Sequence, residues 1–155
     1  MISSVKSNIY EVNAISTLAV YGDFIEGTPQ QTALTISTRA LGQAGRDAAS
    51  KSMRALGFGD AGCAWVWLAE GDGSEIALGA ADLMSIVEGL DPLGIIVADK
   101  DAATLLGQAY RCTLPADDAS RVMGRNVASF SNLEAMLGEE AGKQKAWAIM
   151  KKAFR

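Results

Sequence analysis

The sequence predicts a three-layer α/β/α sandwich around a central, mostly parallel, four-stranded sheet. Two short runs, 63–68 (CAWVWL) and 95–97 (IIV), are apolar throughout, which is typical of strands covered on both faces. Helical patterns lie before and after the second run, so we expect right-handed crossovers between parallel strands. The chain has 155 residues, of which 49% are hydrophobic, and is long enough to bury one sizeable core. We therefore expect a single domain over 1–155, with an irregular N-terminal extension over 1–15.

The first half of the chain is expected to contain two strands and one helix. Residues 16–23 (STLAVYGD) form a short apolar run closed by a glycine, which predicts a strand, and 24–31 predict a loop. A helix is expected within 42–59, ending at Gly57, because glycine readily adopts the left-handed conformation that follows a helix. The glycine-rich, acidic segment 69–79 predicts a loop. The expected inner face of the helix consists of Ala44, Ala48, Met53 and Leu56.

The middle of the chain carries the clearest helix signals. Apolar residues recur at i, i+3, i+4 and i+7 within 81–90, which predicts an amphipathic helix that ends at Asp91-Pro92. After the strand at 95–97, Asp99 is expected to cap the next helix. The apolar faces of these two helices are Leu83, Ile86, Val87 and Leu90 in the first, and Ala102, Leu105, Leu106 and Ala109 in the second.

The C-terminal third is expected to hold the last strand and a terminal helix. A loop is predicted over 111–120, then a turn at 124–126 and a strand at 127–130. Ser131 and Glu134 have the spacing of a capping box, in which each side chain bonds to the other's backbone amide. The terminal helix presents an apolar stripe of Ala146, Trp147, Met150 and Phe154.

The composition excludes several kinds of site. The chain contains no histidine, which excludes histidine-dependent triads and metal sites. Its two cysteines, Cys63 and Cys112, are isolated, so we expect neither a disulfide nor a metal site, and no cofactor. The formal net charge of −4 disfavours non-specific binding to nucleic acid. Basic residues gather in the terminal helix, where we favour a solvated helix face over a phosphate-binding patch.

The sequence favours a cytoplasmic location without membrane contact. No apolar run approaches the roughly 20 residues that span a bilayer. The first residues, MISSVKSNIYEVNA, lack the apolar stretch and cleavage pattern of a secretory signal.

Five segments in order suggest a family: YGD (21–23), ALGQAG (40–45), CAWVWL, LDPLGIIVADK (90–100) and KQKAW (143–147). Their order and spacing resemble the uracil-DNA glycosylase superfamily, especially its compact bacterial and archaeal branches. The corresponding motifs there are of the types GEAPG, PFVGPAG, YITNVV and RPKVIVALG, followed by an HPS-type loop before a helix with a K…W pattern. The resemblance spans nearly the whole chain and implies the glycosylase architecture. Those enzymes flip a base out of DNA and cleave its N-glycosidic bond.

The resemblance also implies which residues line the pocket. Gly22 and Asp23 match the start of the first motif, followed by Phe24, and Asp23 would supply the catalytic carboxylate. Ala40 stands at the position of the phenylalanine that stacks on the flipped base. Trp67 stands at the position of the asparagine that reads the edge of the base.

The catalytic histidine of the family corresponds to Asn132, or to Ser131 with a one-residue slip. Neither side chain carries positive charge. Removing one preorganised donor from a site of developing charge raises the barrier by roughly 3 to 4 kcal/mol. Without the asparagine amide that reads the base, polar groups of the bound base stay unpaired, which weakens binding by about 1 to 3 kcal/mol. The resemblance therefore predicts the glycosylase frame with an altered active site.

We accordingly expect a uracil-DNA glycosylase-like protein without standard glycosylase activity, which binds a partner protein or a nucleotide-like ligand. Two alternatives remain open. One is a divergent DNA or nucleoside glycosylase that uses Asp23, and the other is an unrelated small α/β interaction domain.

For several candidate residues we favour structural roles over functional ones. Asp23 is expected to cap a turn or helix rather than act in catalysis. Trp65 and Trp67 share one face of their strand, where we favour core packing over an aromatic wall at a crevice. Arg121 and Arg125 are candidates for phosphate contact, although exposed structural arginines are the commoner case.

Overall fold

The chain forms a mixed α/β structure around one six-stranded sheet. The computed structural model describes residues 9–70 and 75–155. The sheet has the strand order β1-β3-β2-β4-β6-β5. Its strands are β1 (Ile25–Glu26), β2 (Ala33–Ser37), β3 (Cys63–Trp67), β4 (Gly94–Val97), β5 (Asp118–Val122) and β6 (Arg125–Ser129). Strands β3, β2, β4 and β6 are parallel, whereas β1 and β5 pair antiparallel at the two edges. The predicted α/β class is confirmed, but the sheet has six strands instead of four.

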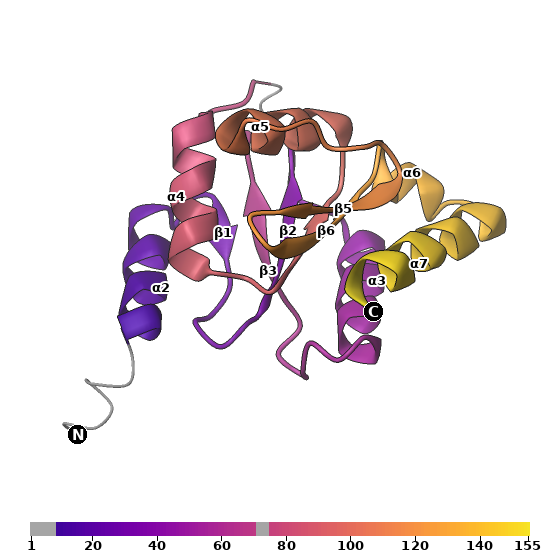
Figure 1. Ribbon diagram of the computed structural model, residues 1–155, viewed down its shortest axis with the longest axis horizontal. Coiled ribbons are helices and arrows are strands. Elements are labelled where there is room, and N and C mark those ends of the chain that lie inside the picture. The colour runs from indigo at the N-terminus through magenta and orange to yellow at the C-terminus, as the bar shows by residue number, and fades with distance from the viewer. Residues whose placement is uncertain (1–8, 71–74) are drawn as a thin grey trace.

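Helices cover both faces of the sheet (Figure 1). On one face lie α4 (Ala80–Leu90) and α5 (Lys100–Tyr110), with α2 (Ile9–Val20) beside α4. On the other face lie α3 (Gln43–Ala55), α6 (Leu133–Met136) and α7 (Glu140–Phe154). Within the described residues, no helix has the length and apolar character needed to cross a membrane.

Alternation along the strands divides the core into two clusters. In β4, Ile95 and Val97 pack with α4 and α5, whereas Ile96 packs with α3 and α7. All three side chains are fully buried. A parallel strand covered on both faces must be apolar at every position, which explains why the prediction from 95–97 was correct.

The predicted first strand at 16–23 is wrong, because this segment is the second half of α2 followed by a turn. Ala14 is buried and Leu18 packs against the core. These two residues are four positions apart, so they lie on one face of α2, as expected for a helix. The first parallel strand is instead β2. Of the extension expected over 1–15, residues 1–8 lie outside the described residues, and the rest belongs to α2.

The helix predicted within 42–59 is present as α3, but its inner face is shifted. Gly45, Ala49 and Met53 are buried, while Ala44 is exposed. Gly57 follows the helix with a positive φ of 93°, as predicted for its end.

The loop predicted over 111–120 is partly wrong, because its last residues begin β5. Strands β5 and β6 form a hairpin whose turn residues, Met123 and Gly124, have φ values of 49° and 81°. Positive φ at both central residues is the geometry of a tight hairpin turn, so β6 begins at Arg125, two residues earlier than expected.

Candidate functional site

The carboxyl ends of the four parallel strands meet at one edge of the sheet. From β2 the chain continues to β3 on one side, and it later returns to β4 on the other side of β2. The gap between the loops after β2 and β4 is thus a topological switch point, where open α/β sheets commonly bind ligands. A polar cavity of about 370 Å³ lies here, with Thr38, Arg39, Asp99, Lys100, Asn132 and Glu134 among its lining residues.

Asp99 connects the loops on the two sides of this switch point. Its carboxylate accepts hydrogen bonds from the backbone N–H and hydroxyl of Thr38, at 2.7 and 2.5 Å. It also accepts a 2.9 Å bond from the Ala102 N–H, which confirms its predicted role as the cap of α5. Both carboxylate oxygens have structural partners, so Asp99 serves to hold the loops together.

The segment after β6 is also held by its own polar side chains. Asn132, not Ser131, caps α6 through a 3.0 Å bond from the Ala135 N–H, so the predicted capping box is wrong. Ser131 donates its N–H and hydroxyl to the carboxylate of Asp117. Glu134 accepts from the Gly42 N–H at 3.1 Å and thereby ties α6 to the start of α3.

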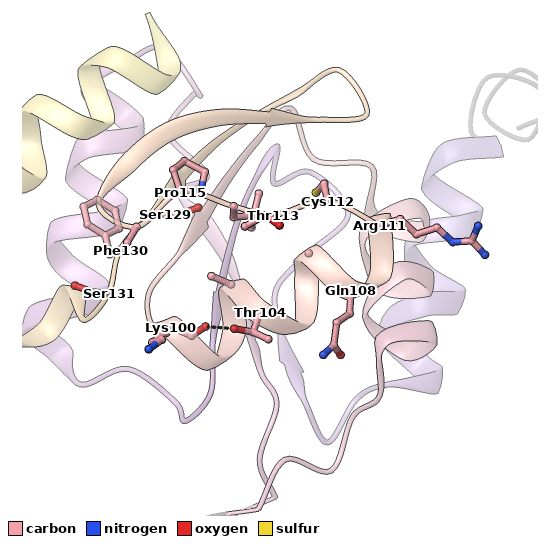
Figure 2. Close-up of a pocket in the computed structure, with 14 residues that line it drawn as sticks. Lys100, Thr104, Gln108, Arg111, Cys112, Thr113, Pro115, Ser129, Phe130 and Ser131 are labelled. Carbon is pink, nitrogen blue, oxygen red and sulfur yellow. Dashed lines mark hydrogen bonds between the residues drawn. The ribbon is translucent and has the colours of Figure 1, made fainter.

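A second and larger pocket, of about 680 Å³, adjoins the polar cavity and shares Lys100 and Ser131 with it. We call it the α5 pocket, because one wall is α5 and the opposite wall is the segment 111–116 with the end of β6. Figure 2 shows Lys100, Thr104 and Gln108 along the helix, and Thr113 and Ser129 on the neighbouring segment and strand end.

Ser129 contributes a buried hydroxyl to the α5 pocket. The residue is 1% exposed, and its Oγ has no hydrogen-bond partner among the described residues. Ser129 follows Val127 by two positions, so both side chains face α5, and Val127 packs in the core cluster beneath that helix. A buried hydroxyl without a partner costs about 1 to 3 kcal/mol of stability. The hydroxyls of Thr35 and Ser120 are in the same condition, but of the three only Ser129 lines the α5 pocket.

The two cysteines differ in their surroundings. Cys63 is buried in β3, and burial raises the pKa of its thiol from 9.0 to about 11. Cys112 is exposed and lines the α5 pocket. Both are free, and the described residues contain no group of three metal-ligating side chains.

The residues assigned by resemblance to the first motif lie near the end of β3. Gly22, Asp23 and Phe24 form the turn between α2 and β1. The indole N–H of Trp67 donates to the Asp23 carbonyl at 3.1 Å, and its backbone N–H donates to the Phe24 carbonyl at 3.0 Å. Ala40 lies in the loop between β2 and α3. Trp65, on the same strand as Trp67, is partly buried against the second core cluster.

The remaining two pocket candidates are far from this turn. Ser131 and Asn132 follow β6, three strand positions away from β3. At the usual spacing between strands this separates them by about 14 Å. The structure therefore brings Asn132 together with Thr38 and Asp99 in the polar cavity, whose lining includes neither Asp23 nor Trp67.

The two arginine candidates lie on the β5–β6 hairpin. Arg125 is at the start of β6, at the end opposite to the polar cavity, and its side chain is 12% exposed. Its guanidinium pairs with Glu88 at 2.9 Å and with Asp91 at 2.8 Å. Arg121 donates to the Gly124 carbonyl at 3.2 Å. Arg125 thus fastens the hairpin to the end of α4.

Sequence reasoning did not single out Lys100, Thr104 or Ser129. One available signal was the hydroxyl of Ser129 directly after the apolar pair Val127-Ala128, at the end of a strand expected to be covered. The other residues lie on the exposed face of a helix, where polar side chains are ordinary.

Comparison with models of known protein families and with curated proteins finds no match for this chain.

Proposed function

We propose that this chain is a ligand-binding α/β domain of uracil-DNA glycosylase-like architecture, without standard glycosylase activity, which binds a small molecule in the α5 pocket. The observation that carries the proposal is the buried, unpartnered Oγ of Ser129 in a pocket of about 680 Å³. Pockets of this size, mostly apolar with a few placed polar groups, are typical of small-molecule sites.

The separation of the candidate glycosylase residues supports a binding role over base excision. Asp23 and Trp67 lie near the end of β3. Asn132 lies after β6, and its side chain caps α6. No histidine is available as a donor to a leaving base. Excision needs these groups around a single flipped base.

The segments behind the family resemblance give the architectural part of the proposal its support. ALGQAG leads into α3, CAWVWL contains β3, and LDPLGIIVADK contains β4 and opens α5. The segment YGD does not end a strand, because it follows α2. KQKAW lies within α7, so the glycosylase-like architecture rests on four of the five segments.

A fragment screen observed by NMR tests the binding role. The uniformly ¹⁵N-labelled full chain is titrated with a mixed library of small neutral, cationic and anionic fragments. We expect hits that shift the amide resonances of residues 100–116 and 129–131. In Thr104→Trp the indole fills the α5 pocket from its exposed helical wall, and these shifts should disappear.

The matched control places the same side chain on another helix. Met84 on α4 is 40% exposed and does not line the α5 pocket, so Met84→Trp should keep the shifts. A library without hits, or hits that bind Thr104→Trp as well as the parent protein, would overturn the proposed function.

A further inference from the structure

The α5 pocket contrasts in charge with the rest of the molecule. The chain as a whole carries a formal charge of −4. The residues that line the pocket nevertheless include two cations, Lys100 and Arg111, and no aspartate or glutamate. Asp117, next to the lining segment, has both carboxylate oxygens engaged by Ser131. The charges that line the pocket therefore favour an anion.

The cation of the pocket that lies beside the strand ends is Lys100. Its backbone N–H donates to the Ser131 carbonyl at 3.2 Å, which holds the first turn of α5 against the segment after β6. Its ammonium has no partner among the described residues. Arg111 lies at the other end of α5, and its guanidinium points away from the other labelled residues (Figure 2).

The lining mixes polar and apolar side chains along its length, with Thr104, Gln108 and Thr113 between its two ends. Ser129 and Lys100 belong to the end at the carboxyl edge of the sheet. The wall of α5 and the segment opposite also contribute Ala103, Leu114 and Pro115, whose side chains are hydrocarbon. A ligand with a charged head at the Lys100 end and a hydrocarbon body can pack against these three side chains.

We infer that the α5 pocket binds an amphipathic carboxylate, whose carboxylate group accepts from the Lys100 ammonium and the Ser129 hydroxyl while its hydrocarbon part packs along α5. This inference rests on the proposed function. A carboxylate satisfies both donors at once, because each of its oxygens accepts hydrogen bonds. A phosphate group is usually recognised by arginine forks or several donors, which this end of the pocket lacks.

Isothermal titration with head-group variants of one hydrocarbon chain tests the inference. Octanoate, 1-octanol, octylammonium and octyl phosphate are each titrated into the full chain below their micelle concentrations. We expect octanoate to bind about tenfold more tightly than 1-octanol, since a hydrogen bond to a charged group is stronger than one to a neutral group. Octylammonium should bind more weakly than either.

Variants identify the two donors. Lys100→Met keeps the length of the side chain and should weaken octanoate binding by about tenfold while leaving 1-octanol unchanged. Ser129→Ala should weaken both ligands severalfold. Lys145→Met, which removes an exposed charge from α7, is the control and should change neither.

The outcomes separate this inference from the proposed function. Equal affinity for octanoate and 1-octanol, or an unchanged octanoate affinity in Lys100→Met, overturns the carboxylate while binding of neutral fragments still supports a ligand site. Tighter binding of octyl phosphate than octanoate overturns it as well. If no fragment and no octyl compound binds, both proposals fail together.

Discussion

Asp99 at the end of β4 accepts two hydrogen bonds from Thr38 at the end of β2, one from the backbone N–H and one from the hydroxyl. The two residues come from neighbouring strands of the sheet that are separated by 61 positions in the chain. The same carboxylate caps α5. One side chain therefore fixes the start of α5 relative to β2, and with it a wall shared by the polar cavity and the α5 pocket.

Asp99→Ala should lower the free energy of unfolding by about 2 to 4 kcal/mol, because it removes a helix cap and charge-assisted bonds to Thr38. Urea denaturation followed by circular dichroism measures the change. Asp101→Ala removes an exposed carboxylate from the same helical turn and should cost less than about 1 kcal/mol. Equal losses in the two variants would contradict the role given to Asp99.

Ser129→Ala should raise the free energy of unfolding of the ligand-free protein by about 1 kcal/mol, because a buried hydroxyl without a partner is removed. Thermal and urea unfolding measure the gain. Ser131→Ala is the matched control: its hydroxyl bonds to Asp117 at 2.9 Å, so this change should destabilise the protein by about 1 kcal/mol. A destabilised Ser129→Ala variant would mean that the hydroxyl has a structural partner.

The purified chain should release no uracil from single-stranded DNA that contains deoxyuridine. The double variant Trp67→Asn, Asn132→His should also be inactive, because the two positions are about three strand spacings, roughly 14 Å, apart. Alkaline cleavage at abasic sites, resolved on a denaturing gel, measures release. Far-ultraviolet circular dichroism of the double variant verifies that it is folded. Base release by either protein would favour the divergent glycosylase alternative.

Because of Cys63, the free energy of unfolding should decrease as the pH rises from about 9 to about 11. The folded protein keeps the thiol protonated, since burial raises its pKa from 9.0 to about 11. The stabilisation is complete below pH 9 and is lost as the pH rises, because the unfolded chain then binds fewer protons than the folded one. Urea unfolding at pH 8, 9 and 10 measures this slope.

Cys63→Ala should flatten that slope below pH 10. Above pH 10 both proteins should lose further stability, because burial and the neighbouring Glu88 raise the pKa of Tyr110 above its usual range. A slope unchanged by Cys63→Ala would show that another group is responsible. As an independent check, a disulfide reagent at pH 8 should modify Cys112 rapidly and Cys63 only upon unfolding.

Much of the fold follows from local sequence patterns. The helices α4 and α5 were predicted from the helical period of their apolar residues. The strands β3 and β4 were predicted from continuous apolar runs, which a parallel strand covered on both faces requires. The segment 16–23 was misread as a strand, since a short apolar run has no period that separates strand from helix. β2 was missed because Thr35 and Ser37 make this central strand look half-exposed, although both residues are buried.

The site was less accessible to sequence reasoning than the fold. Asn132 and Ser131 were expected at a strand end and lie there, yet their side chains cap α6 and bond to Asp117. Ser129 is of interest because its hydroxyl has no partner in the described part of the chain, and this depends on how the segment 111–116 and α5 pack around the end of β6. No local sequence pattern encodes that packing.

The position of β2 and β4 within the sheet has a consequence for how the molecule opens. Each has a parallel strand on both sides, whereas β1 is only two residues long and β5 closes the other edge as part of a hairpin. In hydrogen–deuterium exchange, the amide protons of β2 and β4 should exchange slowest, because both strands are hydrogen-bonded to a neighbour on each side. The edges of the sheet can therefore open locally while its centre stays paired.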